Sequence, residues 1–399
     1  MYRVISSIKV EQQPTKDFPL RNKTLLFDFA HTYDCNDSWR ELTSTGKIVI
    51  PKHLYYRDAN NKLQPLDGTL INIGGFSSTP PLLMRGDKVT IDHGYKYFKN
   101  GREVYEGTES VSGEHLFTGW ISQVTSKKPI EFLIENNMWK LKQIPAPTHT
   151  FLKSDTLESI LKFLLQGTGF EVATNTETTF GEFKIGNETV AEVLSRLRKA
   201  YRFESFFRGN TLYSGSLPYS SIVPKVRTFT FQQNIISDEL EYRRKDDIVL
   251  SAVATNTIET DTGKVTKDGH PKTKRSRLEV LVTLRNGSEV PDVFVKPLHG
   301  DYPPNTGGER RNLFFPGANN VADLTTLATN ELKKYYYTGF KGKFTTFGIP
   351  FTRMGDNVQL VDPILPERNG LYKVRSCEYS GGVGGLRQTI ELDYKILLQ

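Results

Sequence analysis

Cysteine is scarce in this sequence, since Cys35 and Cys377 are the only two among 399 residues. Two cysteines cannot form a framework of disulfide bonds, so the fold must depend on ordinary apolar cores. The two thiols could still pair with each other if the two ends of the chain met. We favour two buried free thiols, in a chain made in a reducing compartment.

Long apolar runs are also missing. The longest candidate, residues 160–165, falls far short of the roughly 18–20 residues that a membrane-spanning helix needs. Residues 1–8 lack the continuous apolar region of a signal peptide. The sequence therefore predicts no membrane insertion and no export signal, and so a protein made in the cytoplasm of its host.

No motif for catalysis, a cofactor or a metal is recognisable. His31 and Cys35 are four residues apart, but no second pair completes a zinc site. Gly167 and Gly169 follow a helical pattern and precede a strand, the reverse of the order in a dinucleotide-binding fold. The glycine-rich residues 381–385 lie between two strands and open no helix that could bind phosphate. We therefore assign no catalytic, cofactor-binding or metal-binding residue, and predict that the chain is not an enzyme.

Charge is present but mild, with a formal net charge of +7. The basic residues are mostly dispersed, which argues against a dedicated nucleic-acid surface. One cluster is an exception: Lys264, Lys267, Lys272, Lys274, Arg275 and Arg277. It contains no aromatic residue that could stack on a base, so we favour a solvated hairpin loop. A loop that contacts an anion or a nucleic acid is the alternative.

The dominant feature is a Gly-Asp turn that leads into an apolar strand pattern, and this combination occurs twice, at Gly86-Asp87 and at Gly355-Asp356. Glycine tolerates a positive φ, and aspartate can accept a hydrogen bond from its own backbone two residues on. A period-two run of Val, Ile and Leu follows each turn, which predicts a strand with one buried face. The turn also accounts for the Arg-Gly-Asp sequence at Arg85, with no need for an adhesive function. The chain thus contains two related β units near its two ends.

Between these units the pattern changes, and we predict a mainly β fold with an α+β insert. Residues 1–147 form a first β domain, with strands at 24–33 and 48–50, a polar loop at 57–68 and a long exposed hairpin at 92–113. Residues 148–216 form a small α+β domain, and residues 217–399 form a second β domain. That last domain carries an inserted β hairpin, about 248–290, and a helix, about 320–338.

Side chains at several turns and helix starts are assigned by the same reasoning. His93 reads as a turn residue after a strand rather than as a ligand. Ser154 or Asp155 is expected to cap the first helix of the α+β domain, and Asn187 the second. Asn319 or Asn320 is expected to cap the helix of the second β domain.

The order of these elements resembles the tail hub proteins of long-tailed phages, which are akin to the late-control D proteins and to the head of the valine-glycine-repeat spikes of type VI secretion. The resemblance covers roughly residues 20–142, 150–215 and 320–396 and is weakest over 216–318. It rests on the segments 39–42, 46–52, 85–91, 117–121 and 130–142, on the helices that begin near Thr156 and Thr189, and on the turn at Gly355-Asp356.

The resemblance implies two similar antiparallel β-barrel domains in each chain and a homotrimer that adapts a hexameric tail tube to a trimeric spike. Closure into a ring would pair exposed sheet edges and stop open polymerisation. The implied partners are a tail tube or distal tail protein, the central spike protein and the tape-measure protein, with DNA only in transit through the lumen. A lumen that must release its cargo should have no strong aromatic and basic lining. The implied location is the tail or baseplate of a virion.

Two points limit or compete with this interpretation. Members of the family often continue into an oligonucleotide-binding-fold module and a needle, whereas this sequence stops at Gln399, so spike and lysis functions are expected on separate proteins. The competing hypothesis is a carbohydrate- or receptor-binding β protein. Its motivation is the exposed-looking aromatic set of Trp39, Trp120, Tyr95, Tyr97 and Tyr105.

Overall fold

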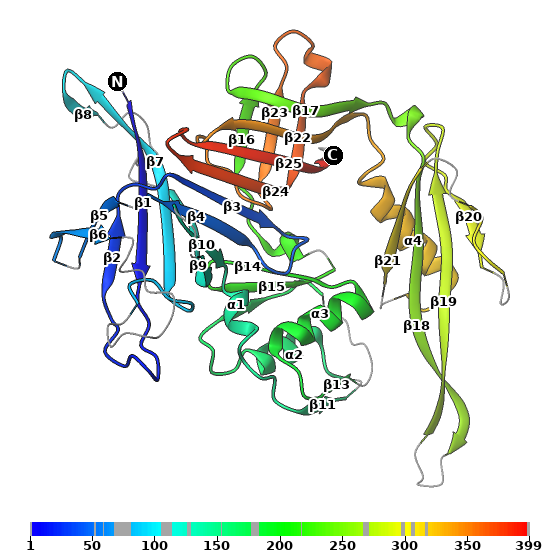
Figure 1. Ribbon diagram of the computed structural model, residues 1–399. Helices are drawn as coiled ribbons and strands as arrows, with labels where there is room; N and C mark the ends of the chain where they lie inside the picture. Colours follow the sequence, from blue (N-terminus) through cyan, green and yellow to red (C-terminus); the bar gives the residue numbers. More distant parts are fainter. Residues whose placement is uncertain are drawn as a thin grey trace.

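The computed structural model contains 25 strands and four α-helices within the residues it describes (Figure 1), which confirms the prediction of a mainly β fold with helical insertions. The described residues are 2–51, 53–58, 60–67, 81–104, 114–125, 129–152, 154–176, 183–216, 218–265, 271–296, 300–304, 308–315 and 318–396. None of the helices described is both long and apolar enough to cross a membrane.

The first β unit contains the first Gly-Asp turn, which leads directly into β7. Its strands lie side by side in the order β1 (Tyr2–Glu11), β7 (Lys88–Lys99), β9 (Glu114–Val124), β10 (Ile130–Glu135), β4 (Thr45–Ile50) and β3 (Thr32–Ser38). Beyond β1 the sheet continues through β2 (Thr24–Phe27), β5 (His53–Arg57) and β6 (Leu63–Asp67), while β8 (Arg102–Val104) pairs with β7. The prediction of a polar loop at 57–68 was wrong, because β6 forms an antiparallel hairpin with β5 there.

The second β unit repeats this order of neighbours. Its strands are β16 (Val226–Thr230), β23 (Asn357–Val361), β24 (Gly370–Gly382), β25 (Arg387–Ile396), β22 (Gly339–Phe347) and β17 (Ile235–Arg243). The copies differ at one end: β1 runs antiparallel to β7, whereas β16 runs parallel to β23. The two units therefore share a layout, with one strand reversed.

The two units are joined into one 16-stranded sheet. The joint is the antiparallel pairing of β3 with the C-terminal half of β24, from Ser376↔Ser38 to Gly382↔Thr32, which we call the junction ladder. One apolar cluster extends through both units. Its fully buried rings include Phe27 and Phe132 from the first unit and Phe229 and Phe344 from the second.

A small α+β segment lies below this sheet in Figure 1. It follows the short α1 (Met138–Leu141) and contains β11 (His149–Phe151), α2 (Leu157–Leu164), β12 (Glu171–Ala173), β13 (Phe183–Ile185), α3 (Val190–Tyr201), β14 (Glu204–Arg208) and β15 (Thr211–Gly215). The predicted caps were wrong here: Thr156 caps α2, and Thr189 caps α3 through a capping box with Glu192. Each threonine hydroxyl accepts a backbone N–H that the first turn leaves unpaired.

The remaining segment projects at the right of Figure 1, and we call it the arm. It is a four-stranded sheet in the order β20 (Asp292–Val295), β19 (Pro271–Leu284), β18 (Leu250–Val265) and β21 (Glu309–Phe314), with α4 (Val321–Lys333) packed on one face. Asn320 caps α4, as predicted. Short 3-10 turns occupy Pro218–Ser221, Lys245–Asp247 and Pro366–Arg368.

Candidate functional site

The first Gly-Asp turn fixes the start of β7. Gly86 adopts a φ of 92°, which only glycine takes up readily, and its N–H donates to the carbonyl of Ile121 at 2.8 Å. The N–H of Ile121 donates in return to the carbonyl of Asp87 at 2.8 Å. The Asp87 carboxylate accepts the N–H of Met84, three residues back, at 2.8 Å. The aspartate thus bonds upstream of itself, and not two residues on as we predicted.

The second turn repeats these contacts atom for atom. Gly355 has a φ of 80° and donates to the carbonyl of Val374 at 3.0 Å, and the N–H of Val374 donates to the carbonyl of Asp356 at 2.9 Å. The Asp356 carboxylate accepts the N–H of Arg353, three residues back, at 3.0 Å. Because the hydrogen bonds coincide, Ile121 of β9 is the equivalent of Val374 of β24.

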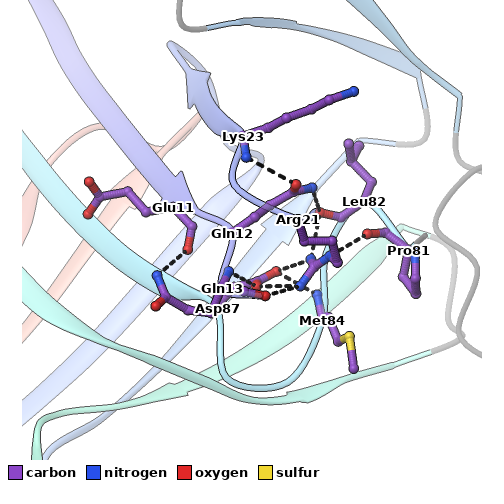
Figure 2. Close-up of polar contacts among 9 residues, drawn as sticks. All are labelled: Glu11, Gln12, Gln13, Arg21, Lys23, Pro81, Leu82, Met84 and Asp87. Carbon is purple, nitrogen blue, oxygen red and sulfur yellow. Dashed lines mark hydrogen bonds and ion pairs between the residues drawn. The ribbon is translucent and has the colours of Figure 1, made fainter. Parts of the chain in front are cut away.

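An arginine completes the first turn (Figure 2). Arg21 donates to both carboxylate oxygens of Asp87, at 2.8 and 2.6 Å, and the two side chains are 1% and 0% exposed. The N–H of Gln13 adds a further bond to the same carboxylate at 3.0 Å. A buried carboxylate needs this degree of compensation, since removing an ion from water costs several kcal/mol. Local sequence patterns did not reveal Arg21, which lies 66 residues away.

The second turn has a looser version of this ion pair. Arg208 reaches Asp356 at 3.3 Å, and its side chain is 20% exposed. The N–H of Lys225 donates to the same carboxylate oxygen at 3.3 Å. Arg208 ends β14, so the cation comes from the α+β segment, whereas Arg21 belongs to the first β unit itself.

The solvent-facing side of the sheet is polar across the junction ladder. One row of directly paired residues crosses seven neighbouring strands, from β10 to β17: Glu135, Thr45, Asn36, Glu378, Thr389, Thr345 and Ser237. This row contains no aromatic and no basic residue. A shallow depression of about 580 Å³ lies over the middle of it.

Several charges on the same face are paired with one another. In the row beside the first, Arg375 contacts Glu391 at 3.0 Å, and Lys343 of β22 contacts Glu239 of β17 at 3.5 Å. The hydroxyl of Ser376 also donates to Glu391, at 2.7 Å. On the other side of the first row, Arg387 has no ion pair with a described residue and lies over the exposed ring of Phe347, at 5.2 Å. The paired charges and small hydroxyl groups near the first row hold phosphate weakly.

The prediction that His93 is a turn residue was wrong. It lies within β7, 1% exposed, with its ring among those of Tyr33, Phe351 and Tyr379 at centroid distances of 6.3, 5.4 and 6.4 Å. Neither ring nitrogen has a hydrogen-bond partner among the described residues, and burial lowers the pKa of His93 to about 4. Because Tyr379 belongs to β24, this neutral imidazole fills space where the two β units meet.

Asp393 of β25 is a second buried group that the sequence did not single out. It is 7% exposed, its Oδ2 has no hydrogen-bond partner in the described part of the chain, and Arg40 is 3.8 Å from Oδ1. Burial is the main cause that raises the pKa of Asp393 to about 6. When this buried carboxyl group is ionised it destabilises the folded state, because no cation lies close enough to compensate its charge fully.

The other residues considered from the sequence have the following positions. Cys35 and Cys377 are both buried and free, which confirms the favoured prediction for them. Trp39 and Trp120 are 4% and 7% exposed, so neither ring offers a stacking surface for a sugar. No group of three or more His, Cys, Asp or Glu side chains lies close enough to hold a metal ion in the part of the chain that the structure describes.

The basic cluster and the polar hairpin are only partly described. Lys274 and Arg277 are exposed on β19, and the strands of that hairpin extend further than predicted, to Val265 and from Pro271. Residues 266–270 lie outside the described residues, as do residues 105–113, which include Tyr105. Tyr95 is 8% exposed and therefore belongs to the core.

Known proteins provide a likeness of fold. No family model matches the sequence, and no curated protein does. The solved tail protein from Neisseria meningitidis MC58 superposes with a TM-score of 0.54 at 13% identity, covering 98% of this chain and 96% of the other. The 43 kDa tail protein of prophage MuSo2 from Shewanella oneidensis gives a TM-score of 0.51 at 11% identity, covering 98% of each chain. The chain therefore has the fold of these tail proteins, which confirms the predicted resemblance at the level of fold.

Proposed function

We propose that this chain is a structural hub of a phage tail or of a phage-derived injection machine. The observation that carries the proposal is the pair of Gly-Asp β units with matching hydrogen bonds, joined by the junction ladder. Two like units per chain allow three chains to offer six nearly equivalent positions, as a hexameric tube requires. The fold shared with two solved tail proteins supports the same conclusion.

The strand order indicates how three chains would close. Within one chain, β3 pairs with β24 beyond Val374. The equivalent strands are β17, which ends the described sheet, and β9 beyond Ile121. In the proposed ring, β17 of one chain pairs with the residues of β9 beyond Ile121 in the next chain, and each of the three contacts repeats the start of the junction ladder. Exposed strand edges are satisfied in this way, and closure prevents open polymers.

In the ring, the polar face of the sheet lines the channel. DNA and the tape-measure protein pass through it, and the row from Glu135 to Ser237 contributes neither an aromatic ring nor a cation to that passage. A tail tube or distal tail protein binds one side, and a central spike protein binds the other. The chain is accordingly a virion tail component without catalytic activity, divided at 1–147, 148–216 and 217–399.

Oligomeric state is the first test of this proposal. Native mass spectrometry of the purified chain, alone and mixed with its spike partner, should show three copies per complex. A chain that stays monomeric with the spike, or an assembled tail that contains one copy, would contradict the proposal.

A disulfide trap tests the proposed pairing directly. The equivalence places Gln123 opposite Arg243 of the neighbouring chain, as Ser376 lies opposite Ser38 in the junction ladder. The double variant Gln123→Cys, Arg243→Cys should therefore form covalent trimers on mild oxidation, whereas each single variant should not. Trimers that resist cross-linking in the double variant would rule out this register, even if the trimer itself forms.

The competing hypothesis of a carbohydrate-binding protein loses its basis. Of the five aromatic residues that motivated it, Trp39, Trp120 and Tyr95 are buried, while the side chain of Tyr97 and residue Tyr105 lie outside what the structure describes. No described feature favours it over the structural role.

A further inference from the structure

A groove of about 460 Å³ runs between the arm and the body of the protein. One wall is β21 along its whole length, from Glu309 to Phe314. The facing wall is formed by Trp39 and Arg40 of the first β unit and by Arg202 at the end of α3. A strand therefore forms one side of the groove.

That strand edge is open. β21 is the last strand of the arm sheet within the described residues and pairs only with β18, in parallel. The N–H groups of Glu309 and Phe315 donate to β18 or the residue before it, at 3.2 and 3.0 Å. Since the backbone groups of a strand alternate in direction, those of Arg310, Asn312 and Phe314 point away from β18, toward the open edge. These are the groups that an added strand would bind.

The acidic side chains of the groove are already neutralised: Glu204 by Arg198 at 2.8 Å, Glu331 by Lys334 at 2.6 Å, and Glu309 by Arg311 at 2.8 Å and Lys341 at 2.9 Å. Two arginines of the groove, Arg202 and Arg310, form no ion pair with any residue the structure describes. Arg310 donates to the carbonyl of Pro303, at 2.9 Å, and its Nε has no partner. The groove thus has an excess of unneutralised positive charge.

Trp39 gives the facing wall an apolar surface. Its indole lines the groove but is only 4% exposed, and its ring packs against Tyr219 at a centroid distance of 4.8 Å. The open strand edge and the two arginines call for the same kind of ligand, one that is extended and rich in acceptors.

We propose that this groove binds an extended, acidic peptide segment of a neighbouring protein, which adds to β21 as a fifth strand of the arm sheet. Main-chain hydrogen bonds to Arg310, Asn312 and Phe314 give the affinity, as in other cases of strand addition. Carboxylates of the segment meet Arg202 and Arg310, and this sets its charge. The site lies outside the polar face assigned to the channel and does not depend on ring formation.

Fluorescence anisotropy with the full chain tests this proposal. The probe is a fluorescein-labelled peptide of about ten residues in which Glu and Thr alternate, a length that spans the groove. We expect saturable binding that weakens at least about ten-fold in the double variant Arg202→Glu, Arg310→Glu. A matched peptide with Lys in place of Glu should not bind.

Two controls separate strand addition from simple charge attraction. Asn312→Pro removes an outward N–H without removing a bond to β18, and it should abolish binding, whereas Asn312→Ala should bind like the wild type. A probe with every second amide N-methylated keeps its charges but cannot pair as a strand, so it should not bind the unaltered chain. This last control requires no change to the protein.

Four results would overturn the proposal. They are no saturable binding of the acidic probe, equal binding of the lysine peptide, equal binding of the N-methylated probe, and unchanged binding by Asn312→Pro. A single-stranded oligonucleotide that displaces the probe and is itself insensitive to Asn312→Pro would assign the groove to nucleic acid instead, which also overturns it.

Discussion

Replacing Arg21 by methionine tests whether the first Gly-Asp turn depends on its buried ion pair. The substitution keeps the apolar stem and removes two bonds to Asp87, at 2.8 and 2.6 Å, from a site that is essentially closed to water. Removing one partner of a buried pair costs roughly 3–5 kcal/mol, because the remaining charge is uncompensated. Asp87 keeps the N–H groups of Gln13 and Met84, so we expect about 3 kcal/mol.

Arg208→Met is the matched control in the second unit. Its single contact with Asp356 is 3.3 Å long, and the side chain is 20% exposed, so solvent screens much of the interaction. We expect a loss of only about 1 kcal/mol. The two variants thus apply the same chemical change to equivalent sites that differ in burial.

Urea unfolding followed by tryptophan fluorescence measures both losses. Trp120 and Trp139 stack at a centroid distance of 6.0 Å, and Trp139 lies beside the Gly86 turn, so their emission reports on the first unit. Adding Asp87→Asn to Arg21→Met should cost less than the sum of the two single changes, by about 2 kcal/mol. A loss below about 1 kcal/mol for Arg21→Met, or one no greater than that of Arg208→Met, would refute the reasoning.

Three further predictions concern pH and packing. Asp393→Asn should raise the free energy of unfolding by about 2 kcal/mol at pH 7 and leave it unchanged near pH 4. The reason is that the raised pKa of Asp393, about 6, makes the wild type lose stability as pH rises from about 4 to 6. Equal gains at both pH values in urea titrations would contradict this. His93→Leu should reduce the loss of stability at acid pH, because a pKa lowered to about 4 makes the wild type lose stability as pH falls below about 6.5. If the melting temperature of the variant fell with acidification as much as that of the wild type, His93 would not be the cause. Gly119→Ala should cost about 2 kcal/mol or more, because the added methyl group would collide with the backbone carbonyl of Glu135. Gly186→Ala is the control and should be nearly neutral, because the space around Gly186 is open. Similar melting temperatures for the two variants would count against the collision.

The repeated turns could be read from the sequence because their signal is local. Gly86-Asp87 and Gly355-Asp356 each occupy two residues, and the period-two strand follows at once. What could not be read is the partner of each carboxylate. Arg21 lies 66 residues from Asp87, and Arg208 lies 148 residues from Asp356, and pattern reasoning has no means to connect such distances.

Other errors had identifiable causes. β1 was missed because Ser6 interrupts the apolar alternation of Val4, Ile8 and Val10, and its pairing with β7 replaces the missing local signal. His93 was misplaced because a polar residue between Asp and Gly resembles a turn, although tertiary contacts bury it.

The sequence did contain a signal for the N-terminal cap of α3. Glu192 follows Thr189 by three residues, which is the spacing of a capping box, and this should have outweighed Asn187. The candidate groove was invisible for a different reason. The groove brings together Trp39, Arg202 and β21, which are far apart along the chain and lie close to one another only in the folded protein.

The origin of the second cation has an evolutionary consequence. The first turn obtains Arg21 from its own β unit, so that unit is electrostatically complete. The second obtains Arg208 from the α+β segment, which therefore supplies the counter-ion of a strand start 148 residues away. A descendant that lost residues 148–216 would lose Arg208 with them, but the Asp356 carboxylate would still accept the N–H groups of Arg353 and Lys225. The cost would be about 1 kcal/mol, so the insert can be lost without replacing that aspartate.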